Sequence, residues 1–144
     1  MQQIVQFYSN HPVLFISWIM LLFFLVFSTI QTYFYKFKTI SCNEATLLIN
    51  KANAKVIDIR SYEEYCQGHI YNSINILASD IKKGKYQIID NYQLVPIIIV
   101  STDTHGMKQI DSAIKLTESG FKKVFILESG INGWNKANLP LVRR

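Results

Sequence analysis

Residues 95–116, VPIIIVSTDTHGMKQIDSAIKL, could place chemistry at a strand end, because a β-branched apolar run is followed by a short polar turn and a helical pattern. In such a layout the backbone N–H groups of the turn and the start of the helix converge, which favours an anion at that point. We therefore predict a binding site in the turn, a possible anion cradle. Its residues are Ser101, Thr102, Asp103, Thr104, His105, Gly106, Met107 and Lys108.

A nucleophile in this turn would have to use oxygen, because the turn contains no cysteine. Ser101 is a weak nucleophile, because its hydroxyl is not appreciably ionised at neutral pH. The Asp103 carboxylate cannot act as a thiol, because it carries no sulfur. Without a nucleophile to deprotonate, His105 is interpreted as a solvent-facing loop residue, although it and Lys108 could help to hold an anion. We therefore assign no catalytic residue to the turn.

The Asp103 carboxylate leads to a specific hypothesis. If this side chain points into the turn, backbone N–H groups would hold it as an internal anion. External oxyanions would then be excluded from the cradle.

The two cysteines, Cys42 and Cys66, stand outside the turn. We interpret both as small packing residues, although their positions near helix starts could lower a thiol pKa and leave a reactive role open. Two cysteines do not indicate a disulfide framework, and they fit a reducing compartment at least as well as an oxidising one. Scattered histidines and cysteines give no metal-ligand spacing, so we predict no metal site and no cofactor.

Strands and helices alternate around the turn. Ser41–Glu44 and Ser61–Glu64 have the Ser-x-x-Glu form of a capping box, and each predicts a helix, the first reaching about Asn50. Compact, nearly continuous apolar runs indicate strands buried on both faces, as in a parallel sheet covered by helices. These runs are Val56–Ile59, Ile74–Ile76, Ile97–Val100 and Val124–Leu127. The pattern predicts an α/β fold with right-handed crossovers.

The helix after the turn is expected to bury one apolar side. That side contains Met107, Ile110, Ala113, Ile114 and Thr117. Gly120 stands where a left-handed C-terminal cap is needed, so we expect the helix to end just before it.

The first 35 residues contain no Asp, Glu, Lys or Arg. Val13–Ile30 would extend about 27 Å as a helix, close to the hydrocarbon thickness of a bilayer. A cleaved secretory signal would begin with Lys or Arg, and a buried core helix would be shorter and polar on one side. We therefore predict a short periplasmic N-terminus at 1–12, a transmembrane helix with its interfacial flank at 13–35, and a cytoplasmic domain at 36–144.

The orientation follows from basic residues after the span, beginning with Lys36 and Lys38, and none before it. Such a bias keeps the C-terminal part in the cytoplasm. The predicted location is the bacterial inner membrane, crossed once. The net charge of +5 comes from basic residues scattered among acids, which is typical of a solvated face and gives no reason to expect nucleic acid as a partner.

Two segments resemble the rhodanese family. VIDIRSYEEYCQGHIYNSINI, residues 56–76, is similar to its opening half, and SGFKKVFILESGINGW, residues 119–134, is similar to its closing half. Together they bracket the turn, and the likeness covers about residues 39–142. The whole plan is similar to small membrane-anchored rhodanese-like proteins of enteric bacteria. The resemblance implies a five-stranded parallel sheet with helices on both faces, preceded here by one transmembrane helix.

Active members of this family have a Cys-x-x-Gly-x-Arg turn whose cysteine accepts sulfur as a persulfide. Counting back from Gly106 puts the cysteine position on Asp103 and the arginine position on Lys108, whereas counting forward from the strand puts the cysteine position near Ser101. The turn is about two residues longer than usual, so both alignments stay open. His69 corresponds to a structural position of the family.

Asp58 and Arg60 are expected to brace the end of the sheet, with each other or with Glu64, rather than to bind a substrate. We predict a domain without sulfurtransferase chemistry, which works as an interaction or scaffold module beside other inner-membrane proteins. Two alternatives stay open. One is a sulfurtransferase that uses Cys66, Cys42 or a thiol supplied by the substrate, and the other is a sensor that binds a small anion.

Overall fold

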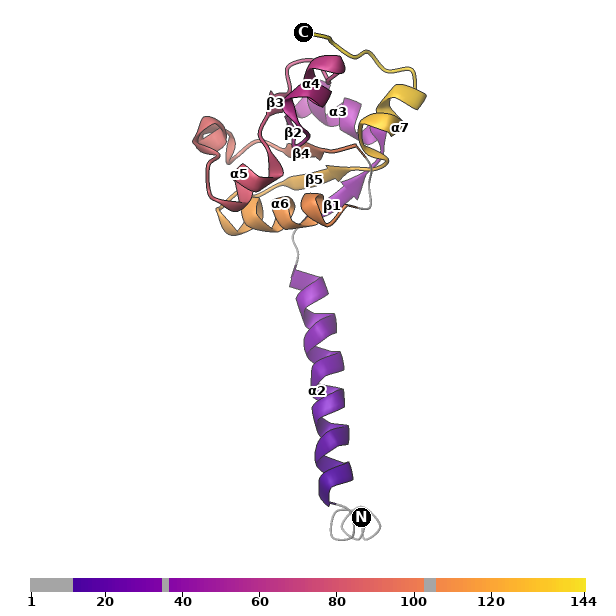
Figure 1. Ribbon diagram of the computed structural model, residues 1–144, viewed down its shortest axis with the longest axis vertical. Helices are drawn as coiled ribbons and strands as arrows, with labels where there is room; N and C mark the ends of the chain where they lie inside the picture. Colours follow the sequence, from indigo (N-terminus) through magenta and orange to yellow (C-terminus); the bar gives the residue numbers. More distant parts are fainter. Residues whose placement is uncertain (1–11, 35–36, 103–105) are drawn as a thin grey trace. The chain divides into compact units, whose positions relative to one another are not determined.

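The computed structural model describes residues 12–34, 37–102 and 106–144, with the side chains of the first range as far as residue 27. Residues 1–11 of the predicted periplasmic segment lie outside this range. The chain divides into two units, Met1–Tyr35 and Lys36–Arg144, and each is considered by itself (Figure 1).

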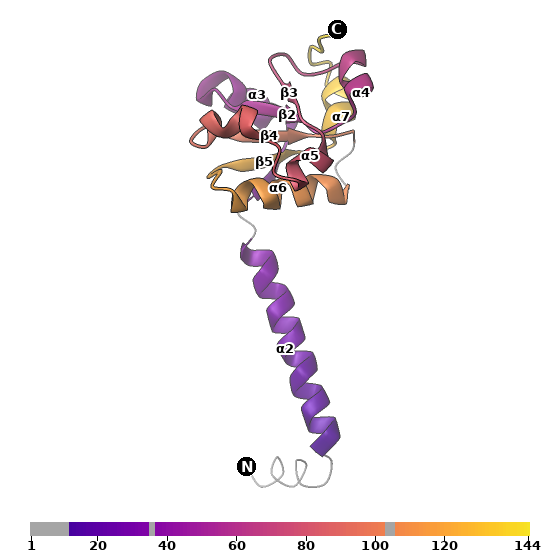
Figure 2. The same cartoon turned by 60° about the vertical axis from the view of Figure 1, so that its left-hand side comes forward.

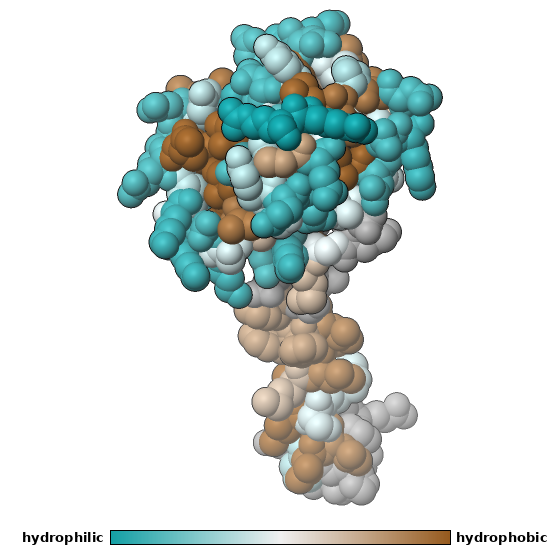
Figure 3. Space-filling model, turned by 45° about the horizontal axis from the view of Figure 1, so that its top comes forward, coloured by the Kyte–Doolittle hydropathy of each residue, from teal (hydrophilic) through white to brown (hydrophobic). Residues whose placement is uncertain are grey.

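The described part of the first unit is one helix, α2, Pro12–Phe34. Proline at the first helical position is favourable, because the N–H that it lacks would have no partner there. Large apolar side chains from Val13 to Phe27 are exposed, and the described part of this helix is coloured largely as hydrophobic in Figure 3. Among the described residues, no helix combines the length and the hydrophobicity that a membrane span requires. The predicted transmembrane helix is therefore not confirmed.

The second unit is built on a five-stranded sheet in the order β1-β5-β4-β2-β3, with every neighbouring pair parallel. Its strands are β1 Phe37–Ile40, β2 Lys55–Asp58, β3 Ile74–Asn75, β4 Ile97–Val100 and β5 Val124–Leu127. Four of them coincide closely with the predicted apolar runs. All four residues of β4 are buried, as expected of a central strand covered on both faces.

The fifth strand, β1, was not among the predicted apolar runs. It pairs with β5 from Phe37 opposite Val124 to Ile40 opposite Leu127. Lys38 and Thr39 are exposed because β1 is an edge strand, and only Ile40 is buried. A four-residue edge strand therefore has no apolar run by which it could be detected.

Helices cover both faces of the sheet, as predicted (Figures 1 and 2). One face packs Ile81, Ile89 and Leu116 against strand residues such as Ile57. The other packs Ala45, Ile131 and Trp134 against residues such as Val56. The first face is therefore covered by α5 Ala78–Lys82, the 3-10 helix η1 Gln87–Tyr92 and α6 Met107–Glu118. The other face is covered by α3 Cys42–Ala52 and α7 Gly130–Lys136.

Both predicted capping boxes are present. At the start of α3, Glu44 N–H donates to Ser41 Oγ at 3.3 Å, and Ser41 N–H donates to Glu44 Oε2 at 2.9 Å. Ser61 and Glu64 make the same reciprocal pair at the start of α4, Tyr62–Gln67. The Ser-x-x-Glu pattern therefore located both helix starts.

Of the residues predicted to be buried on α6, only Ala113 is buried, at 0% exposed. The buried residues of α6 are Gln109, Ser112, Ala113 and Leu116, whereas Met107 is 78% exposed and Ile110 is 41% exposed. The side of α6 that is buried contains two polar residues, Gln109 and Ser112. The Ser112 hydroxyl has a partner within the helix, because it donates to the carbonyl O of Lys108 at 2.6 Å. Gly120 does have the predicted positive φ, at +99°, just after the helix.

Candidate functional site

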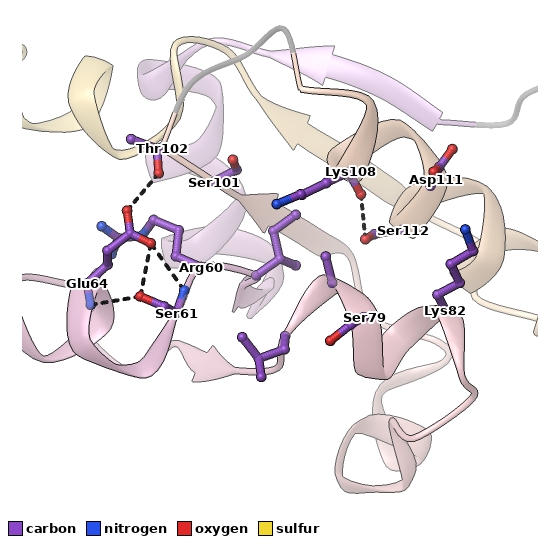
Figure 4. Close-up of a pocket in the computed structure, with 13 residues that line it drawn as sticks. Arg60, Ser61, Glu64, Ser79, Lys82, Ser101, Thr102, Lys108, Asp111 and Ser112 are labelled. Carbon is purple, nitrogen blue, oxygen red and sulfur yellow. Dashed lines mark hydrogen bonds between the residues drawn. The ribbon is translucent and has the colours of Figure 1, made fainter.

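A pocket of about 490 Å³ opens beside the carboxyl ends of β2 and β4 (Figure 4). In open α/β sheets this is the edge where ligands usually bind. Hydroxyl groups in its lining come from Ser61, Ser79, Ser101, Thr102 and Ser112, and charged groups come from Arg60, Glu64, Lys82, Lys108 and Asp111. Three apolar residues, Ile59, Leu77 and Ala78, complete the lining.

The predicted cradle contributes only part of this pocket. Ser101, Thr102 and Lys108 line it, while Gly106 is the N-terminal cap of α6 and Met107 is exposed outside it. Residues 103–105 lie outside the described residues. The Asp103 hypothesis and the interpretation of His105 therefore stay predictions.

Glu64 fixes the first residues of the turn. Thr102 Oγ1 donates to Glu64 Oε1 at 3.1 Å, and Glu64 Oε2 accepts from the Ser61 N–H at 3.2 Å. Burial alone raises the pKa of Glu64, but hydrogen bonds from Ser61 and Thr102 and the charge of Arg60 outweigh burial and leave this pKa below its ordinary value. Glu64 thus joins α4 to the turn as a carboxylate, a contact that its capping pattern alone did not reveal.

Arg60 and Asp58 form a buried ion pair at the end of β2. Arg60 Nη2 lies 2.7 Å from Asp58 Oδ2, and Arg60 Nε lies 3.0 Å from Asp58 Oδ1. The two side chains are 8% and 1% exposed, respectively, and Arg60 Nη2 also donates to the carbonyl O of Gly68 at 2.7 Å. The expected contact between Asp58 and Arg60 is therefore present, and it fixes the guanidinium at the wall of the pocket.

Neither thiol lies in the pocket lining. Cys42, in the first turn of α3, packs against the core on the α7 side of the sheet. Burial raises the pKa of the Cys42 thiol, so this group stays protonated at neutral pH and is a poor nucleophile. Cys66 is half-buried on α4, and its carbonyl O accepts from the Arg144 N–H at 3.1 Å.

His69 is a structural residue, as the family resemblance implied. Its ring is buried and stacks on Tyr65 with a centroid distance of 3.8 Å. Its Nδ1 lies 2.9 Å from the Tyr65 carbonyl O, and its backbone pairs with that of Val142. These contacts tie the C-terminal segment to the end of α4.

No three His, Cys, Asp or Glu side chains form a group that could hold a metal ion within the described ranges. The described lining of the pocket offers hydroxyl, carboxylate, ammonium and guanidinium groups.

Comparison with known proteins agrees with the fold. The family model of the rhodanese-like domain matches residues 41–137. The chain belongs to the rhodanese-like family. Among relatives of the chain, YibN of Escherichia coli (strain K12) is 43% identical over 143 residues, which are 99% of each chain.

Two further proteins are informative. The thiosulfate sulfurtransferase GlpE of Actinobacillus pleuropneumoniae is 28% identical over 105 residues, covering 73% of this chain and 93% of that one. A crystal structure of a rhodanese-related protein from Thermoplasma volcanium has a TM-score of 0.62 and 24% identity, and the match covers 74% of this chain and 99% of that one. The second likeness concerns the fold alone.

Proposed function

We propose that this rhodanese-like domain does not transfer sulfur and acts as a non-catalytic interaction or scaffold module, anchored at the bacterial inner membrane. The observation that carries this proposal is the described lining of the pocket, which contains hydroxyl, charged and apolar side chains but no thiol. Other inner-membrane proteins are the proposed partners.

The chemistry of sulfur transfer supports this proposal. Transfer through a persulfide needs a cysteine thiolate where the donor binds. The described polar side chains at the start of the turn are Ser101 and Thr102, and oxygen cannot replace sulfur in a persulfide. The raised pKa of Cys42 further disfavours a displaced nucleophile at that position.

The first prediction concerns turnover. The full-length protein in detergent is expected to form thiocyanate from thiosulfate and cyanide no faster than the uncatalysed reaction. Cys42→Ser and Cys66→Ser variants should behave like the native protein, and GlpE of A. pleuropneumoniae serves as the active control. Turnover that either serine substitution abolishes would overturn the proposal.

A sulfurtransferase is the second candidate function, because the chain is similar to GlpE. This candidate needs Cys66, Cys42 or a thiol brought by the substrate to reach the pocket. The same assay distinguishes the sulfurtransferase from the non-catalytic module. Adding a small thiol such as dithiothreitol tests whether a thiol supplied by the substrate supports turnover.

The membrane anchor is part of the proposal and is supported by the sequence of α2. Residues 13–30 are uncharged, whereas basic residues begin at Lys36. This arrangement favours a span with its N-terminus outside and the domain in the cytoplasm.

The second prediction tests this anchor with trypsin, which can cut only after residue 35 because Lys and Arg are absent before it. The chain is expected to stay in the membrane after an alkaline carbonate wash. Trypsin should leave the domain intact in spheroplasts and degrade it after lysis, which also proves that the domain is cleavable. Release by carbonate would refute the anchor, and digestion in intact spheroplasts would refute its orientation.

A further inference from the structure

We propose that a second pocket, beside the edge strand β3, binds a tryptophan side chain presented by a partner protein. This inference deepens the proposed function, because it rests on a domain that works by contacting other proteins. The pocket has a volume of about 470 Å³, which is within the range of small-molecule sites. Its lining comes from α4, from the segment between α4 and β3, from β3 and from the C-terminal segment. Figures 1 and 2 show α4 and β3 close to the C-terminus.

Tyrosine side chains form much of the lining. Tyr62 and Tyr71 line the pocket and are 58% and 75% exposed, respectively. Tyr65 also lines it but is only 7% exposed, and its ring stacks on that of His69. Exposed and buried aromatic rings together offer flat apolar surfaces on which another aromatic ring can pack.

The His69 ring offers a hydrogen-bond acceptor that has no donor among the described residues. The ring lines the pocket, although the residue is only 6% exposed. Its Nδ1 lies 2.9 Å from the Tyr65 carbonyl O, and because a carbonyl O can only accept, Nδ1 carries the hydrogen. A neutral ring then presents Nε2 as an acceptor. Nε2 is not one of the buried side-chain atoms that lack a partner, so it reaches solvent and is open to a donor from a ligand.

The other polar groups of the lining agree with a neutral donor. Asn75 Nδ2 donates to the carbonyl O of Asp58 at 3.0 Å and to that of Arg60 at 2.9 Å, which leaves Asn75 Oδ1 as a second acceptor. The described lining contains no Asp or Glu, and Arg144 is a cation within it, so a cationic group is disfavoured. An indole ring donates one N–H and carries no charge, and a backbone N–H of the same partner can reach the second acceptor.

Hydrogen bonds hold the pocket in shape before any ligand binds. Lys55 Nζ donates to Asn72 Oδ1 at 3.0 Å, and Tyr65 OH donates to the carbonyl O of Ser73 at 2.8 Å. The backbone N–H groups of His69 and Val142 donate to each other's carbonyl O at 2.9 and 2.8 Å. A preformed site loses less conformational entropy on binding.

Tryptophan also suits the proposed partners. Its side chain is among those that contribute most to the binding energy of protein interfaces. Membrane proteins concentrate tryptophan at the membrane–water interface, so inner-membrane partners offer such side chains.

A chemical-shift titration of the ¹⁵N-labelled full-length protein in detergent tests the inference. The probes are acetyl-Gly-Trp-Gly-amide, the same peptide with 1-methyltryptophan, and free indole. The tryptophan peptide is expected to bind saturably and at least about tenfold more tightly than the methylated one, which leaves Nε2 without a donor. His69 is structural, so the donor is removed from the peptide rather than the acceptor from the protein. Methylation makes the peptide more apolar, so partition into the detergent cannot produce this order.

Tyr71→Ala and Tyr62→Ala should each weaken binding of the tryptophan peptide about fivefold or more, because each removes an aromatic surface. Both side chains are exposed, so neither variant should lose its fold, and a thermal melt checks this. Leu94→Ala is the matched control, since Leu94 is a 77% exposed apolar residue outside the lining. No saturable binding, equal affinity for the methylated peptide, or an equal loss in Leu94→Ala would each overturn the inference. Free indole that binds as tightly as the peptide would overturn the assignment to a partner protein.

The titration and the turnover assay can fail independently, because both thiols lie outside the lining of this pocket. Cysteine-dependent turnover would overturn the proposed function while peptide binding stood. Absence of peptide binding would overturn this inference while the lack of sulfur transfer stood.

Discussion

Replacing Asp58 with alanine is expected to destabilise the domain by about 3–5 kcal/mol, because it leaves a buried guanidinium without its counter-ion. Arg60 would keep only the carbonyl O of Gly68 among its described side-chain partners. The backbone N–H of Arg60, which donates to Asp58 Oδ1 at 3.0 Å, would also lose its acceptor. Thermal unfolding of the full-length protein in detergent should show a melting temperature lower by roughly 10–20 °C.

Lys38→Ala is the matched control for Asp58→Ala. Lys38 belongs to an exposed ion pair with Glu44 at 3.8 Å, so its removal should leave the melting temperature almost unchanged. The double variant Asp58→Ala/Arg60→Met should be more stable than Asp58→Ala alone, because no unpaired charge remains buried. An Asp58→Ala variant as stable as Lys38→Ala would contradict the role assigned to the buried pair.

Gly130→Ala is expected to have the second large effect, a decrease of about 2–5 kcal/mol in the free energy of unfolding. Gly130 has φ +52°, where an L side chain adds about 1–2 kcal/mol of strain. A Cβ would also overlap the carbonyl O of Ser101 and lie 2.8 Å from that of Thr102. Both are backbone atoms, so the start of the turn would have to move, and overpacking of this kind costs about 1–3 kcal/mol.

Gly84→Ala isolates the strain from the overlap. Gly84 has φ +78°, and a Cβ there meets nothing within 4 Å. Thermal unfolding should therefore show a smaller decrease in melting temperature for Gly84→Ala than for Gly130→Ala. Equal losses would mean that Gly130 does not support the turn by close approach.

The central strands could be predicted from the sequence because burial on both faces leaves an unbroken apolar run. Ile97–Val100 and Val124–Leu127 were located to the residue. The edge strand Phe37–Ile40 was missed, since its Lys38 and Thr39 face solvent and its extended conformation depends on pairing with β5. Local sequence does not contain that long-range contact.

Helix α6 shows why an apolar pattern can select the wrong side. Met107 and Ile110 are exposed, while Gln109 and Ser112 are buried. A short hydroxyl side chain can be buried when it bonds within its own helix, as Ser112 does with Lys108. Composition alone does not distinguish such a residue from a solvent-facing one.

The start of the turn could be placed from the sequence, because a turn after a buried strand follows from the fold, and Ser101, Thr102 and Lys108 do line the pocket. The other wall was not predictable. Ser79 and Lys82 lie on the short helix α5 and line the pocket. Lys82 belongs to a basic run in the sequence, which indicates only an ordinary solvated face. Only the sheet order, which places β3 beside β2, brings α5 to the pocket.

The absence of a sulfur-accepting thiol in the described pocket is most directly tested by intact-protein mass spectrometry after incubation with thiosulfate. We predict an unchanged mass for the full-length protein, whereas GlpE of A. pleuropneumoniae should gain one sulfur atom under the same conditions. A gain of one sulfur atom on Cys42 or Cys66 that cyanide then removes would contradict the account.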